Sequence, residues 1–337
     1  MDRRGGNPDH AGMLGRTMII LGALVVVATG ALASVITFNE PVRPPPLAAG
    51  NSIPGIATWN FDDLPPVRSI KARDGARLNY RLYPGRPDRV VVLVHGSTGS
   101  GAEMLKLSQA LQAAGASVYS ISLRGHGGSG TTNGDVSYIG QLDDDLVDLV
   151  KSLQLDKAGV RRTLAGFSAG GGFVLRIAGG PHAALFDDYL AISPYIAQDS
   201  PTNKPNGGWA SVAVPRIIAL SILHGLGLPW FQDLPVVRFA TDAQADNRRT
   251  PIYSFRLVSS LQLGRDWRAV LAGIRSNTRM VVGADDELFN ADQFTTLAKS
   301  LNPRIGVTIV PGETHLGMIT DRGATAVADT WRRLSNE

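Results

Sequence analysis

The segment RTLAGFSAGGG, residues 162–172, decides the fold of this chain and carries its candidate reactive residue. It begins as a short apolar run, passes through GFSAG at 166–170, and continues into an apolar, helix-like segment. This order predicts a strand, a sharp turn and a helix, with Ser168 at the tip of the turn. A serine at such a tip has a strained backbone, so the strand and the helix can pass closely only if small residues lie two positions away. Gly166 and Gly170 satisfy that requirement, and Ser168 is the candidate nucleophile.

The pentapeptide alone does not identify a site, because a chain with 38 glycines produces Gly-x-Ser-x-Gly by chance. An ordinary glycine–serine turn is the alternative, and the flanking pattern must decide. Continuously apolar runs alternate with segments of helical spacing on both sides of Ser168. A strand that is apolar on both faces is covered on both sides, so the pattern predicts an α/β fold with a mostly parallel sheet and helices on both faces. The expected strands are 89–94, 117–122, 189–193, 279–282 and 305–310, and the expected helices are 104–115, 142–153, 293–301 and 316–334.

Composition narrows the class of protein. At 337 residues, 44% hydrophobic and 18% charged, the chain can bury a large core in one main domain with an appendage. The net charge of +4 is spread along the chain without interleaved aromatic residues, which argues against a nucleic-acid partner. The absence of cysteine excludes disulfides and thiolate nucleophiles, and the six histidines are too scattered to predict a metal site. The aspartates 143–145 are expected to be a charge run at a helix N-terminus.

The N-terminus predicts a membrane segment. Residues 1–16 form a polar leader with Arg3, Arg4 and Arg16, and residues 17–38 follow without a charge. At about 1.5 Å per residue, this run can cross the ~30 Å hydrocarbon core as a helix. The positive-inside rule then predicts a cytoplasmic leader and an exported domain.

A cleaved signal peptide is the other interpretation, because ALA at 31–33 before Ser34 has the small residues of a cleavage site. We favour an uncleaved anchor, since the apolar run continues to Phe38. Residues 39–66 are rich in proline and glycine and predict an extended linker. The folded domain is expected to span 67–337 and to open with a hairpin whose turn contains an Asp-Gly pair.

Four segments together resemble the α/β-hydrolase superfamily, over the chain from about Val67 to its end. They occur in the family's order and are far more specific than the pentapeptide alone. The segments are His95-Gly96 after a strand, RGHGGS at 124–129, GFSAG at 166–170, and GADD at 283–286 followed by GETH at 312–315.

The resemblance assigns a catalytic triad to Ser168, Asp286 and His315. The serine hydroxyl needs an imidazole to take its proton, and His315 is the expected base. A carboxylate must orient that imidazole, and the family's Gly-x-x-Asp pattern places it at Asp286 rather than at the adjacent Asp285 or Glu287. These two neighbours are expected to face solvent or to cap the loop.

The resemblance also implies that the backbone N–H groups of Ser97 and Ala169 form the oxyanion hole. His95 is expected to shape the turn that carries Ser97. No cofactor is implied.

Residues from about 195 to 274 read as a long irregular stretch, at the place where such hydrolases carry a cap. Its apolar segments and aromatic residues would suit an acyl chain above the site, or would simply pack the cap. Similarity to the monoacylglycerol lipase and lysophospholipase branch implies a serine hydrolase that cleaves carboxylic esters of small lipid-like molecules through an acyl-enzyme. A serine aminopeptidase or amidase of the same fold, and a noncatalytic membrane-tethered binding protein, are the alternatives.

Overall fold

The computed structural model describes residues 8–44, 61–204, 209–240 and 249–336. Most of the expected linker 39–66 lies outside the described residues. Within them, the central sheet has eight strands in the order β1-β2-β4-β3-β5-β6-β10-β11. The strands are β1 (Arg68–Lys71), β2 (Arg77–Tyr83), β3 (Arg86–Val94), β4 (Ala116–Ile121), β5 (Arg161–Phe167), β6 (Asp188–Ile192), β10 (Asn277–Gly283) and β11 (Gly306–Val310).

The sheet is mostly parallel, as the sequence predicts. All pairings from β4 to β11 are parallel, while β1 and β2 form the expected antiparallel hairpin and β2 pairs antiparallel with β4. The carboxyl ends of the six parallel strands therefore meet at one edge of the sheet, the edge at which ligands bind in open α/β sheets.

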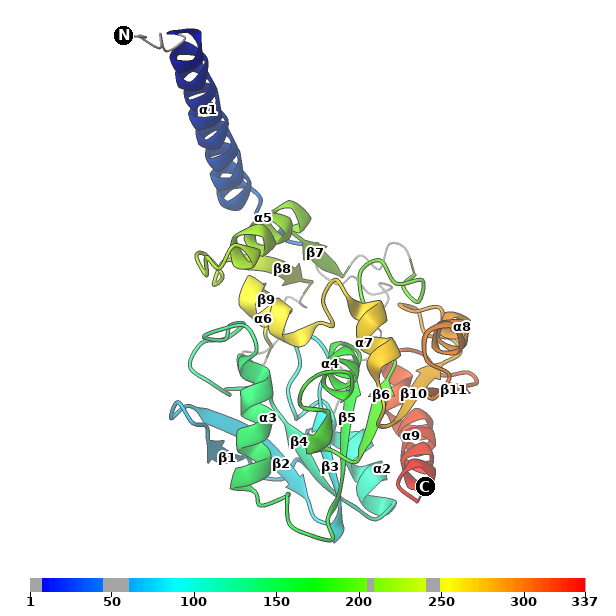
Figure 1. The fold of residues 1–337 in the computed structure, drawn as a ribbon. Coiled ribbons are helices and arrows are strands. Elements are labelled where there is room, and N and C mark those ends of the chain that lie inside the picture. The colour runs from blue at the N-terminus through cyan, green and yellow to red at the C-terminus, as the bar shows by residue number, and fades with distance from the viewer. Residues whose placement is uncertain (1–7, 45–60, 205–208, 241–248, 337) are drawn as a thin grey trace, which may run out of the picture.

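Helices cover both faces of this sheet (Figure 1). Along β3, Val92 and Val94 belong to one buried cluster and Val91 and Leu93 to the other, because successive side chains of a strand point to opposite faces. This arrangement explains the continuously apolar run at 89–94. The first face is covered by α3 (Gln141–Ser152), α4 (Ala169–Ala178) and α8 (Ala291–Leu301), and the second by α2 (Leu105–Ala113) and α9 (Asp321–Leu334).

Two predictions about secondary structure were wrong. The final helix does not run from 316 to 334, because Thr320 is extended and separates the short 3-10 helix η3 (Leu316–Ile319) from α9. The stretch 195–274, which we call the cap segment, is not irregular. Its helices are α5 (Val214–Gly225), α6 (Phe255–Leu261) and α7 (Trp267–Gly273), and its sheet has the order β7-β8-β9, from β7 (Ala210–Val212), β8 (Pro235–Phe239) and β9 (Ile252–Ser254).

The short strands of the cap segment explain that error. Two of them have three residues, too few for an alternating pattern, and their partners are far away in sequence. In Figure 1 the small sheet and α5 lie beyond the carboxyl edge of the central sheet. The cap segment is inserted between β6 and β10.

The N-terminal helix α1 (Pro8–Phe38) begins inside the expected leader and projects from the rest of the molecule (Figure 1). Its apolar part, Gly15–Phe38, has 24 residues, and the most apolar 18-residue window within it has a mean hydropathy of 2.6. Only 6% of its most apolar window is buried against protein. Such a helix fits a membrane anchor or a signal peptide.

Candidate active site

Ser168 lies in the single-residue turn between β5 and α4. Its backbone has φ 54° and ψ −116°, a strained conformation for a residue with a side chain. Its N–H donates to Ile192 O over 2.9 Å, and its carbonyl oxygen accepts from Tyr195 N at 3.0 Å and from Gly172 N at 3.0 Å. These bonds tie the turn to the end of β6 and hold the strained residue in place.

The glycines two residues either side of Ser168 are sterically required. A Cβ on Gly166 would lie 2.4 Å from the carbonyl oxygen of Gly170, and a Cβ on Gly170 would lie 2.4 Å from that of His95. Both distances are shorter than van der Waals contact permits. The segment is therefore a tight strand–turn–helix and not an ordinary glycine–serine turn.

His315 and Asp286 form a buried hydrogen-bonded pair. The imidazole Nδ1 lies 2.8 Å from Asp286 Oδ2, while Asp286 Oδ1 accepts from the N–H groups of Leu288 at 2.9 Å and Phe289 at 3.0 Å. His315 follows β11 and Asp286 follows β10, so the parallel pairing of these strands brings the two side chains together. Because an ionised carboxylate only accepts, Nδ1 carries the hydrogen and Nε2 is left as the basic nitrogen.

The environment keeps Asp286 ionised. Burial disfavours the charge, but the hydrogen bond and the proximity of His315, together with the backbone N–H of Leu288, outweigh burial and lower the pKa of Asp286. The imidazole of His315 also packs against Phe167, the residue before Ser168, with 4.7 Å between ring centroids. The pair is therefore placed beside the turn that carries the serine.

The two acidic neighbours of Asp286 differ in their positions. Asp285 is exposed and its backbone N–H donates to Glu313 O at 3.0 Å. Glu287 Oε2 accepts the backbone N–H of His315 at 2.8 Å, so this side chain fixes the loop of the histidine. The sequence analysis expected both residues to face solvent or to cap the loop. Asp285 faces solvent and Glu287 caps the loop of His315, although the sequence did not identify His315 N–H as its partner.

The turn after β3 lies against Ser168. A Cβ on Gly96 would lie 3.3 Å from Ser168 Cβ, so little space separates the two turns. Among the described residues, neither the Ser97 N–H nor the Ala169 N–H donates to a protein acceptor. Both residues are half-buried, and Ala169 is the first residue of α4, where the helix end attracts negative charge. Both donors are therefore unused, and the Ala169 donor directly follows the serine in the chain.

A buried hydrogen-bond network connects the turn after β3 to the cap segment. Tyr253 of β9 accepts the Thr98 N–H at 2.7 Å and donates its hydroxyl hydrogen to His126 Nε2 at 2.7 Å. His126 Nδ1 then donates to Arg124 O at 3.2 Å. Tyr253 was predicted only as a cap aromatic, since no local pattern links it to residues so far away in sequence.

The neighbouring His95 is structural, as expected. Its Nδ1 donates to Gly96 O at 2.7 Å and its Nε2 accepts the Leu123 N–H at 3.2 Å. Both nitrogens are therefore engaged in holding loops. Burial lowers the pKa of His95, and burial together with the nearby His95 lowers the pKa of His126 far below its ordinary value.

Strand β9 and Thr250, which lies just before it, are hydrogen-bonded to the turn after β3 and to the loop after β4. The Thr250 N–H donates to Thr98 O at 3.0 Å, the Thr250 hydroxyl donates to Gly125 O at 3.1 Å, and the Ser254 N–H donates to Gly134 O at 2.9 Å. This part of the cap segment is thus continuous with the loops around the candidate site.

The three aspartates of α3 do not form a common site. Asp143 pairs with Arg176, Asp144 with Arg73, and Asp145 with Arg124. In the described part of the chain, no group of three His, Cys, Asp or Glu side chains is arranged to hold a metal ion.

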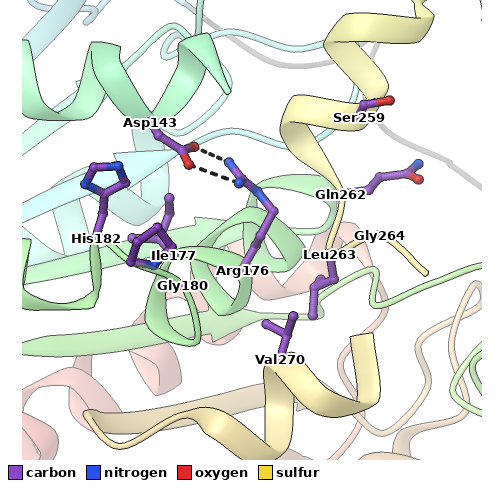
Figure 2. Close-up of a pocket in the computed structure, with 11 residues that line it drawn as sticks. Asp143, Arg176, Ile177, Gly180, His182, Ser259, Gln262, Leu263, Gly264 and Val270 are labelled. Carbon is purple, nitrogen blue, oxygen red and sulfur yellow. Dashed lines mark hydrogen bonds and ion pairs between the residues drawn. The ribbon is translucent and has the colours of Figure 1, made fainter. Parts of the chain in front are cut away.

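The cavity of about 290 Å³ beside α4 is separate from Ser168, Asp286 and His315, none of which lines it. It lies between α3, α4 and the α6–α7 part of the cap segment (Figure 2). The ion-paired side chains of Asp143 and Arg176 are part of its lining.

Comparisons with known proteins bear on the family and the fold of the chain. The family model described as "Serine aminopeptidase, S33" matches residues 85–319. No curated protein sequence matches the chain.

Several solved structures share the fold. A soluble variant of monoglyceride lipase from Saccharomyces cerevisiae, in complex with a substrate analogue, has a TM-score of 0.64 and 17% identity, covering 83% of this chain and 97% of its own. Monoacylglycerol lipase from Paleococcus ferrophilus has a TM-score of 0.57 and 19% identity, covering 77% and 98%. A putative aryl esterase from Burkholderia cenocepacia has a TM-score of 0.53 and 21% identity, covering 81% and 100%.

Proposed function

Because the chain belongs to the serine aminopeptidase S33 family of α/β hydrolases, we propose that it is a serine hydrolase that cleaves carboxylic esters of lipid-like molecules through an acyl-enzyme. The observation that carries the proposal is the buried His315–Asp286 pair packed beside the Ser168 turn. A serine at such a tip, an oriented imidazole and two unused N–H donors are the parts that acyl transfer needs.

In the first half-reaction, Ser168 Oγ attacks the ester carbonyl carbon while its proton passes to His315 Nε2. The pairing of Nδ1 with Asp286 favours this direction, because the carboxylate stabilises the imidazolium that forms. Collapse of the tetrahedral intermediate breaks the carbon–oxygen bond. The alcohol leaves with the proton from His315, and the acyl group remains on Ser168.

In the second half-reaction, His315 takes a proton from water and the resulting hydroxide attacks the acyl-enzyme. The acid is released, and the proton returns to Ser168 Oγ. In both steps the Ser97 and Ala169 N–H groups bind the negative oxygen of the tetrahedral intermediate. The reaction uses side chains, backbone amides and water.

A fluorophosphonate probe tests serine catalysis directly. The folded wild-type protein is expected to be labelled at Ser168, and Ser168→Ala is expected to abolish labelling. Ser300→Ala is the matched control, because that hydroxyl only donates to Leu297 O within α8. A correctly folded wild type that resists the probe would favour the noncatalytic binding protein instead.

The substrate class is proposed from the apolar cap segment and from the two lipases among the structural neighbours. Monoacylglycerol and lysophospholipid are the preferred candidates. The runner-up, a serine aminopeptidase or amidase, is supported by the description of the matching family. A panel of p-nitrophenyl esters of rising chain length, monoacylglycerol, lysophospholipid and aminoacyl anilides decides between them, since faster turnover of the anilides than of any ester supports the runner-up.

We also propose that α1 remains as a membrane anchor, with residues 1–16 cytoplasmic and the hydrolase domain outside. Supporting this, Leu32, which precedes the possible cleavage site after Ala33, packs with Ile36 against the domain. A tag at the C-terminus is expected to be digested by protease added to spheroplasts, and a protected tag contradicts this topology. Intact mass of the purified chain separates the anchor from a signal peptide cleaved after Ala33.

A further inference from the structure

The face of α5 that is turned away from the core is apolar. Val214, Ile218 and Ile222 lie four residues apart and so share one face of the helix. Leu226, Trp230 and Phe231 continue the exposed apolar surface through the following turn. These six residues, the apolar stripe, are each between 48% and 70% exposed although α1 packs beside α5.

No exposed Lys, Arg, Asp or Glu interrupts the apolar stripe. Between Val214 and Gln232, the one Lys, Arg, Asp or Glu is Arg216, whose side chain is 1% exposed, and the exposed Asp233 lies just past the end of the stripe. Its guanidinium donates to Pro235 O at 2.9 Å and to Thr37 O at 3.1 Å, so it fastens α5 to the end of α1. An exposed apolar surface of this extent on a soluble protein marks a contact with a partner or a membrane.

The position of α1 identifies the partner. About 20 helical residues cross a ~30 Å hydrocarbon core, so a helix that enters after Arg16 leaves the core near Ile36. Ile36 and Thr37 are the residues at which α1 meets the domain through buried packing and the Arg216 bond. The contact with α5 therefore lies at the depth of the bilayer surface. In Figure 1, α5 is the helix of the domain beside the end of α1.

We propose that the apolar stripe of α5 and its following turn lies in the boundary between headgroups and acyl chains of the bilayer that α1 spans. The inference rests on the proposed anchoring by α1 and adds a second, surface-lying membrane contact made by the cap segment. Apolar residues with an aromatic pair and no exposed charge suit this boundary. The stripe places the cap segment, which lies beyond the carboxyl edge of the central sheet, against the lipid in which such esters dissolve.

The full chain in phosphatidylcholine vesicles tests this proposal, and the absence of cysteine makes single labels simple. An NBD fluorophore is attached to Ile222→Cys, to Val26→Cys in α1, or to Val67→Cys beside β1. All three positions are exposed apolar residues. With a nitroxide near the end of the lipid acyl chains, we expect the label at 222 to be quenched, but less than the label at 26, because it is shallower. The label at 67 is expected to lose none.

Each other outcome overturns the inference in a distinguishable way. If the label at 26 is quenched and the label at 222 behaves as the label at 67, the anchor stands and the stripe does not touch lipid. If neither 26 nor 222 is quenched, the anchor itself fails. If the label at 222 is protected from both nitroxide lipid and aqueous iodide, a second protein surface covers the stripe.

An activity measurement gives an independent test. Ile222→Glu is expected to lower turnover of monoacylglycerol embedded in vesicles several-fold and to leave turnover of water-soluble p-nitrophenyl acetate unchanged. Val67→Glu is the matched control, expected to change neither rate. An equal loss on both substrates for Ile222→Glu contradicts a role at the lipid surface.

Discussion

Replacing Asp286 by asparagine should move the hydrogen of the His315 imidazole from Nδ1 to Nε2. Asp286 Oδ1 accepts two backbone N–H groups, from Leu288 and Phe289, so the oxygen of the asparagine must stay there. Its NH₂ group then replaces Oδ2, which lies 2.8 Å from His315 Nδ1. An NH₂ group can only donate, so Nδ1 becomes the acceptor and the hydrogen moves to Nε2. A protonated Nε2 cannot take the proton of Ser168.

The expected loss of kcat arises because asparagine lacks the negative charge of Asp286 and no longer holds His315 in the required tautomer. In chymotrypsin-type enzymes the same change of the triad aspartate lowers kcat by about 10⁴-fold, or about 5.5 kcal/mol of transition-state stabilisation, and we expect a loss of that size here, or less if a neighbouring carboxylate substitutes. Asp286→Asn preserves shape and the two backbone bonds, so we expect a folded protein with this defect. Asp285→Asn, at an exposed position, is the matched control and should stay within about tenfold of wild type.

The assay is kcat/KM on a short p-nitrophenyl ester, with thermal unfolding to verify the fold of both variants. Equal losses, or a larger loss for Asp285→Asn, would refute the reasoning. Retained activity in Asp286→Asn would mean that another group orients His315.

Three further predictions concern the support of the site. Gly170→Ala should lower the free energy of unfolding by about 1–3 kcal/mol, because its Cβ would lie 2.4 Å from His95 O; unchanged thermal unfolding would contradict this. Tyr253→Phe leaves the buried Thr98 N–H and His126 Nε2 without their shared partner. It should lower kcat roughly tenfold with KM little changed, and a change in KM alone would argue against positioning of the turn. The lowered pKa values of His95 and His126 mean that below the unfolded-state pKa of about 6.5 the unfolded chain binds protons that the folded chain does not. Urea unfolding should therefore show stability falling by up to about 1.4 kcal/mol per pH unit for each histidine between pH 6.5 and 5.5, and His126→Asn should reduce that slope.

The fold was predictable because its signals are local. The run at 89–94 is apolar throughout because both faces of β3 are buried. The segment GFSAG needs its two glycines because the backbones around Ser168 pack too closely for a Cβ at either position. The positions of Ser168, Asp286 and His315 at the carboxyl edge follow from strand order once the parallel sheet is recognised. The catalytic roles of these residues stay predictions until the probe and the Asp286 variants are measured.

What the sequence could not predict depends on contacts between distant segments. Tyr253 reaches Thr98 and His126 only because β9 folds back over the sheet, and a three-residue strand carries no periodic signal of its own. Glu287 holds the His315 N–H through a loop geometry that adjacent acidic residues do not reveal. The break at Thr320 lies within an otherwise helical pattern, where packing between η3 and α9 overrides local preference.

The joined loops around Thr98, Gly125 and Gly134 limit how this enzyme could be re-engineered. A cap insertion is usually regarded as a module that can be exchanged between relatives to change substrate range. Here residues 250–254 are hydrogen-bonded to the turn that carries Ser97, so exchanging the whole insertion would also remove that turn's support. Grafts that end before Thr250 and replace the α5 side alone would vary the apolar stripe while keeping the hydrogen bonds of residues 250–254 to the turn intact.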